Sequence, residues 1–159
     1  MEDLPATEVA RLVLASPYAA DHESLQRIIN PLFWRFRGFL TGGDCLNFLH
    51  SHDAAVVICE MRLPDCDWSG LMRELDTLPV KPSFIVSARI ADERLWAEAL
   101  NLGAFDLLAT PFDREEVIRV TESAWIAWNR TCGRSVVPRM GPVRKPHTQA
   151  VKVMAQAVG

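Results

Sequence analysis

One acidic residue ends the most apolar stretch of the chain. Glu60 follows the run AAVVIC at 54–59, in which several side chains are β-branched. Such a run is typical of a strand that is buried on both faces, and strands of this kind occur mainly in parallel sheets covered by helices. Ligand sites of open parallel sheets lie beyond the carboxyl ends of the strands. We therefore expect Glu60 to lie at the functional site.

Two arginines follow strand ends close to this carboxylate. Arg62 comes after the run that ends at Glu60, and Arg89 comes after the run at 83–86, which stops at Ser87. A planar guanidinium can hold a carboxylate by two hydrogen bonds. We predict that Glu60 accepts a hydrogen bond from the Ser87 hydroxyl and is neutralised by one arginine. Arg89 is preferred, because its strand adjoins that of Glu60.

The elements that must position these residues alternate along the chain. Apolar runs indicate strands at 11–15, 35–40, 54–60, 83–87 and 105–109. Helical spacing of apolar residues indicates helices at 25–30, 45–49, 68–78, 92–102 and 113–128. In the strand at 35–40 arginines alternate with apolar residues, which is typical of an edge strand. Five β-α units with right-handed crossovers predict an α/β fold: a flavodoxin-like (βα)5 doubly wound parallel sheet, strand order 2-1-3-4-5.

Charge divides the chain into a body and a tail. We expect an N-terminal extension at 1–10, one folded domain at 11–129 and a basic, mobile tail at 130–159. Residues 1–129 hold 20 acidic and 11 basic residues, a net charge of −9, whereas 130–159 hold six basic residues and no acidic one, a net charge of +6. The tail lacks aromatic residues that could stack on bases, so nucleic-acid binding is disfavoured.

Membrane and metal signals are weak. No apolar run approaches the roughly 18 residues of a membrane span, and the first residues lack a signal-peptide pattern, so we expect a cytoplasmic protein without membrane contact. A metal site that uses His50 and His52 with nearby cysteines is a minor alternative. The simplest interpretation is four reduced thiols without a Cys-x-x-Cys pair, at Cys45, Cys59, Cys66 and Cys132.

Over 11–129 the sequence resembles the receiver domain of bacterial two-component response regulators. The matching pieces are Glu60 with Pro64 four residues later, Ser87 before Ala88, and LGAFDLLATPF at 102–112. The last piece is similar to the family ending Ala-Gly-Ala-x-Asp-x-Leu-x-Lys-Pro-Phe with its lysine replaced. The resemblance implies a signalling module, not an enzyme. It also implies a protein partner, and a possible homodimer through the fourth helix, fifth strand and fifth helix.

The chain departs from the family at the positions that its phosphoryl chemistry uses. The resemblance places Glu60 where the family has its phosphoacceptor aspartate, Ser16 and Pro17 where it has Mg²⁺-binding acids, and Thr110 where it has lysine. Leu107 replaces the switch aromatic. Glu60 would then be the single carboxylate of a site without its counter-charge. We predict a degenerate pseudo-receiver with no catalytic residue, no cofactor and weak or absent Mg²⁺ binding.

Several functional interpretations stay open. The leading one is phosphorylation-independent protein-protein interaction, in which Glu60 either imitates the activated state or marks a decayed site. One alternative is a phosphate-accepting receiver that uses a substitute acid, Asp65 or Asp67. Another is a nucleic-acid-binding accessory protein that acts through the basic tail. A nucleotide binder is disfavoured, because no glycine-rich loop follows the strand at 11–15.

Overall fold

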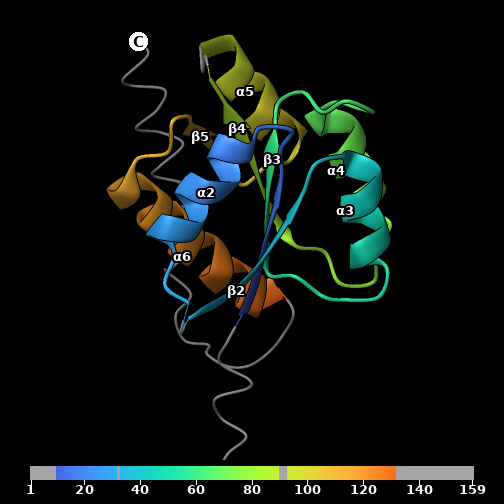
Figure 1. Cartoon of the computed structure of the whole chain (residues 1–159). Helices are drawn as coiled ribbons and strands as arrows, with labels where there is room; N and C mark the ends of the chain where they lie inside the picture. Colours follow the sequence, from blue (N-terminus) through green and yellow to red (C-terminus); the bar gives the residue numbers. More distant parts are fainter. Residues whose placement is uncertain (1–9, 32, 90–92, 132–159) are drawn as a thin grey trace, which may run out of the picture.

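The computed structural model describes residues 10–31, 33–89 and 93–131. Within these residues, five strands and five helices alternate along the chain (Figure 1). The strands are β1 (Ala10–Ala15), β2 (Trp34–Phe39), β3 (Val56–Glu60), β4 (Ser83–Ala88) and β5 (Asp106–Ala109). The helices are α2 (Ala19–Ile28), α3 (Gly42–Leu49), α4 (Trp68–Leu75), α5 (Glu93–Leu102) and α6 (Arg114–Thr131).

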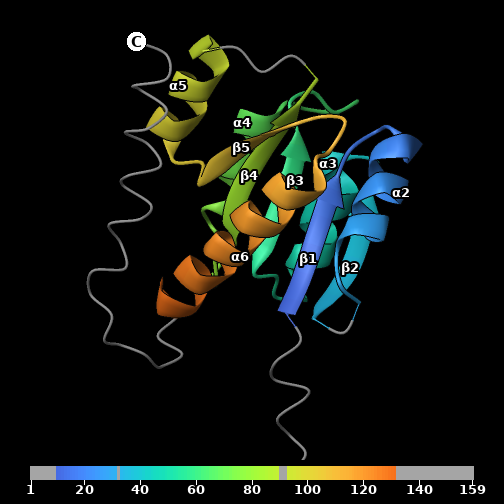
Figure 2. The ribbon, with the colours of Figure 1, turned by 90° about the vertical axis from the view of Figure 1, so that its left-hand side faces the viewer.

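The strands form one parallel sheet in the order β2-β1-β3-β4-β5 (Figure 2). The predicted fold class and strand order are thereby confirmed. β2 lies at one edge, as its alternation of arginine and apolar residues indicated. Every residue of the central strand β3 is buried, and Glu60 stands at its carboxyl end beside the ends of β1 and β4.

Helices cover both faces of the sheet, with α2 and α6 on one face and α3, α4 and α5 on the other (Figures 1 and 2). Successive strand residues point to opposite faces. In β3, Val57 and Cys59 therefore pack with α3, α4 and α5, whereas Val56 and Ile58 pack with α2 and α6. Two apolar clusters result, and they explain why this strand has no polar residue before Glu60.

Element boundaries differ from those predicted, most at the helix expected at 25–30, which spans Ala19–Ile28. The helix expected to reach 78 ends at Leu75, because hydrogen bonds from Thr77 and Leu78 to carbonyls three residues earlier turn the chain there. The last helix runs to Thr131, past the boundary expected at 129. Residues 1–9, the predicted cap Asp92 and the tail from 132 onward, with Cys132, lie outside the described residues. None of the described helices has the length and apolar character needed to cross a membrane.

Candidate functional site

Glu60 and Ser87 meet where two strands end side by side. The register of β3 and β4 pairs them, both are buried, and Ser87 Oγ donates a hydrogen bond of 3.2 Å to Glu60 Oε1. The structure thus contains this predicted hydrogen bond. Burial raises the pKa of Glu60, the hydrogen bond from Ser87 lowers it, and the nearby charge of Asp21 raises it further, so the pKa is raised overall.

Arg89 has a different partner from the one predicted. Its Nη2 lies 3.1 Å from Asp21 Oδ1, and its Nη1 donates a 2.7 Å hydrogen bond to Thr110 Oγ1. The predicted Arg89–Glu60 ion pair is wrong, since the guanidinium is held by Asp21 and reaches Glu60 only as a nearby charge that lowers its pKa. The arginine follows β4 as expected but turns toward α2 and the end of β5.

Asp21 is the site residue that sequence reasoning missed. This carboxylate is 4% exposed in the first turn of α2, and its Oδ2 accepts a 2.8 Å hydrogen bond from Ser16 Oγ. Ser16 Oγ also accepts a 3.1 Å hydrogen bond from the Tyr18 backbone N–H, which ties the end of β1 to the helix. The expectation of a single carboxylate without a counter-charge is therefore wrong. The available signal was an acid five residues after Ser16, near a helix N-terminus, where negative charge is favoured.

Tyr18 covers the same arginine from its exposed side. The Arg89 Cζ atom lies 4.0 Å from the centre of the Tyr18 ring, a cation–π contact. Tyr18 is 43% exposed and the Arg89 side chain is 40% exposed, so this contact lies at the surface of the site. Asp21, Thr110 and Tyr18 together hold Arg89 in one position at the carboxyl end of the sheet.

The remaining predicted site residues fall into two groups. Thr110 is buried and binds Arg89, whereas Pro17 is half-buried beside Ser16. Leu107 is 2% exposed and packs in the core with α3, α4 and α5. Arg62 is exposed in the loop after β3, where its backbone forms a bridge with Asp67. The structure thus joins Thr110 to the site and leaves Arg62 outside it.

Solved structures of known receivers have the same fold. The signal receiver domain of an HD domain-containing protein from Pseudomonas fluorescens Pf-5 matches with a TM-score of 0.73 at 22% identity, covering 85% of this chain and 100% of that one. A CheY-like response regulator receiver domain protein from Methanospirillum hungatei JF-1 matches with a TM-score of 0.68 at 15% identity, covering 77% of this chain and 98% of that one.

Two curated proteins are similar to this chain in sequence. The DNA-binding transcriptional regulator NtrC of Proteus hauseri is 32% identical over 101 residues, which cover 63% of this chain and 21% of NtrC. The chain has the receiver fold of response regulators, and its sequence is similar to part of NtrC. Regulatory protein AtoC of Escherichia coli (strain K12) is 26% identical over 109 residues, 65% of this chain and 23% of AtoC. The chain matches about a fifth of the length of these relatives. No family model matches the sequence.

The two acids considered as substitute phosphoacceptors are engaged at helix N-termini of the receiver. Asp65 accepts hydrogen bonds from the backbone N–H groups of Gly42 (2.9 Å) and Gly43 (2.8 Å), which lower its pKa. Asp67 is the N-cap of α4 and accepts a 3.0 Å hydrogen bond from the Gly70 N–H. Both carboxylates therefore satisfy backbone donors that a helix leaves without partners.

The residues at the receiver site do not fit Mg²⁺. This ion requires near-octahedral oxygen coordination, usually by one or two carboxylates and several waters. Both oxygens of Asp21 already accept hydrogen bonds, from Ser16 and Arg89, and a guanidinium cation stands against this carboxylate. Glu60 is engaged by Ser87. Over 10–31, 33–89 and 93–131, no three His, Cys, Asp or Glu side chains are grouped to hold a metal ion.

The described cysteines are free thiols with little tendency to ionise. Burial raises the pKa of Cys45 to about 12, that of Cys66 to about 11, and that of the fully buried Cys59 well above its usual range. Metal ligation and nucleophilic chemistry both require the thiolate. These side chains pack in the core around α3 and α4 rather than forming a reactive site.

Proposed function

We propose that this receiver domain acts in two-component signalling by phosphorylation-independent protein-protein interaction. The supporting observation is the position of Arg89, which is held by Asp21 and Thr110. An internal cation is thus already bound at a site that would otherwise have to neutralise an incoming phosphoryl group. With its carboxylates engaged, the site has no need of a metal ion to balance its charge, and weak or absent Mg²⁺ binding is part of the proposal.

Glu60 acts in this proposal as a fixed substitute for the activated site. The Ser87 hydroxyl already donates to the glutamate carboxylate, so the ends of β3 and β4 are linked without a phosphoryl group. The longer side chain of glutamate, compared with aspartate, places the carboxylate further from the strand. A buried acid is costly without a hydrogen-bond partner, and the retention of Glu60 together with its partner Ser87 supports a functional role over decay of the site.

The interaction surface that we assign to this function comprises α5, β5 and α6. These elements are the fourth helix, fifth strand and fifth helix in the family's count. Leu102 on α5 is 53% exposed and Ile126 on α6 is 46% exposed, and both are large apolar side chains that a partner could cover. The partner would be a signalling protein or a second copy of the receiver.

Phosphorylation by a small donor tests the proposal directly. The full chain is incubated with acetyl phosphate and Mg²⁺, and its intact mass is measured. We expect no phosphate adduct, and Glu60→Asp alone should also stay unmodified, because acceptor, metal ligands and lysine act as one unit. A stoichiometric adduct on the wild type that disappears in Glu60→Gln would overturn the proposal.

A positive control restores the family residues together. The control variant carries Ser16→Asp, Pro17→Asp, Glu60→Asp and Thr110→Lys. Any adduct that forms on this variant shows that the assay conditions support the reaction on this fold. Circular dichroism of the variant checks that it is folded.

A further inference from the structure

Three arginines gather on one face of the sheet edge, away from the receiver site. Arg11 of β1 is in register with Arg35 of β2, and Arg37 follows two residues later on the same face. Among the described residues, none of the three side chains forms an ion pair with a carboxylate, although Arg11 donates to the Asp53 backbone carbonyl at 3.0 Å. Burial, and then the charges of Arg35 and Arg37, lower the pKa of Arg11, while the nearby charge of Asp53 raises it, and the pKa is lowered overall.

Aromatic rings hold two of these arginines against the sheet. The Arg37 Cζ atom lies 4.7 Å from the ring centre of Phe48 on α3 and 5.4 Å from that of Phe39. Arg11 lies 5.3 Å from Phe48, and His52 stacks on that ring at 4.2 Å. A guanidinium that stacks by its face keeps its in-plane N–H groups free to bind a carboxylate. The rings of Phe48 and Phe39 thus hold Arg37 beside the sheet, and no carboxylate of the described residues is paired with this arginine.

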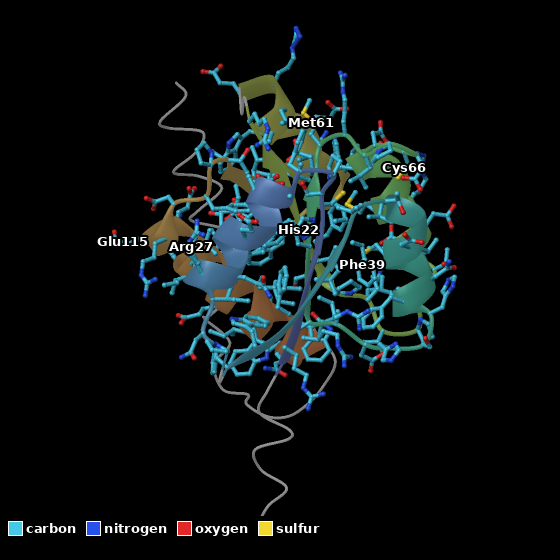
Figure 3. All side chains as sticks on the ribbon, viewed as in Figure 1. His22, Arg27, Phe39, Met61, Cys66 and Glu115 are labelled. Carbon is cyan, nitrogen blue, oxygen red and sulfur yellow. The ribbon has the colours of Figure 1, made fainter. Side chains whose placement is uncertain are left out.

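The backbone of β2 also has free hydrogen-bonding groups on its outer side. The carbonyls of Phe33 and Phe39 accept hydrogen bonds from the N–H groups of Ala10 and Ser16 at the β1 side. Because successive residues of a strand direct these groups to opposite sides, the N–H and C=O groups of Phe36 and Gly38 face outward. In the described part of the chain no strand pairs with this edge. Phe39 lies on the α3 side of β2, and His22 lies on the α2 side (Figure 3).

We propose that the outer edge of β2 binds an extended acidic segment of a partner protein by β-strand addition. The backbone of the segment pairs with Phe36 and Gly38, and its carboxylates, at alternate positions, are bound by Arg35 and Arg37. Alternate residues of an added strand lie on one face of the sheet, and Arg35 and Arg37 are likewise two residues apart on one face of β2. This surface is distinct from the α5, β5 and α6 surface and does not depend on the state of Glu60.

Charge selects an acidic strand over the other possible occupants. A second copy of β2 would place arginine near arginine, and like charges on adjacent strands are destabilising. A nucleic-acid strand would find phosphate contacts but no pairing for the outward backbone groups, and residues 1–129 as a whole carry a net charge of −9. An acidic strand satisfies both the arginines and the backbone.

Peptide binding to the full chain tests the proposal. The probe is a fluorescein-labelled synthetic peptide in which glutamate alternates with valine and threonine, and binding is followed by anisotropy. We expect saturable binding of this peptide. Its affinity should fall about tenfold or more in three control peptides. In the first, glutamine replaces glutamate and removes the charge; in the second, the glutamates are contiguous; in the third, alternate peptide nitrogens are methylated and cannot donate hydrogen bonds. In ¹⁵N spectra the amides of Phe36 and Gly38 should shift most.

Protein variants locate the binding site on β2. The pair Arg35→Glu with Arg37→Glu should abolish binding, whereas Arg73→Glu, at an exposed arginine of α4, should leave it unchanged. The proposal is overturned if the alternating peptide does not bind. It is also overturned if the methylated peptide or a single-stranded oligonucleotide of equal charge binds as tightly, which would show a general polyanion site.

Discussion

Removing the side chain of Arg89 should destabilise the receiver by leaving a buried carboxylate without its cation. The Asp21 side chain is 5% exposed, and after Arg89→Ala its remaining hydrogen-bond partner among the described groups is Ser16. Losing the partner of a fully buried charge costs about 3 to 5 kcal/mol. The Arg89 side chain is 40% exposed, however, so water can reach the vacated side of the carboxylate. We therefore expect a loss of about 1 to 2 kcal/mol in the free energy of unfolding.

A double-mutant cycle isolates the pair. Arg89→Ala, Asp21→Asn and the double variant are unfolded in urea and followed by tryptophan fluorescence, with the exposed Arg94→Ala as a control that should change stability by less than about 0.5 kcal/mol. We expect a coupling energy of about 1 kcal/mol between Arg89 and Asp21. The corresponding cycle with Glu60→Gln should give less, because Arg89 acts on Glu60 without direct contact. Additivity within about 0.3 kcal/mol for the Asp21 cycle, or larger coupling to Glu60, would refute this account of the site.

Two further substitutions test the packing around the site. Burial raises the pKa of Glu60 in the folded chain above its ordinary 4.5, so the folded state holds the proton more tightly than the unfolded state does. The contribution of Glu60 to stability should therefore fall as pH rises from about 4.5 through the raised pKa. Glu60→Gln should accordingly raise the free energy of unfolding at about pH 7. This gain should shrink toward about pH 4 in urea titrations, and a pH-independent gain would contradict the explanation. In Gly38→Ala the new Cβ would clash with His22 Nδ1, whose ring donates from Nε2 to the Ser16 carbonyl, so we expect a loss of about 1 to 3 kcal/mol. Adding His22→Ala should recover most of that loss, and an undiminished effect of Gly38→Ala would locate the cause in the backbone instead.

The arrangement of the strands and the position of Glu60 could be predicted from the sequence. Apolar periodicity is a local property, and Val56 to Cys59 have the pattern of a strand buried on both faces whatever lies around them. Five β-α units then leave few topologies, since parallel crossovers are right-handed. The same topology places the strands that end at Glu60 and Ser87 side by side, so the hydrogen bond between these residues could also be predicted. Its length in the structure is 3.2 Å.

The partner of Arg89 was decided by the tertiary structure. Asp21 and Arg89 are separated by 68 positions in the chain, and no periodicity relates the first turn of a helix to the loop after a distant strand. Local sequence suggested Glu60, because the strands of Glu60 and Arg89 are neighbours. Asp21 binds the guanidinium instead because α2 packs over the end of β1 and brings a nearly inaccessible carboxylate within 3.1 Å of a long, flexible side chain. A buried charge must be paired, and which cation pairs with it depends on the packing of elements that are far apart in sequence.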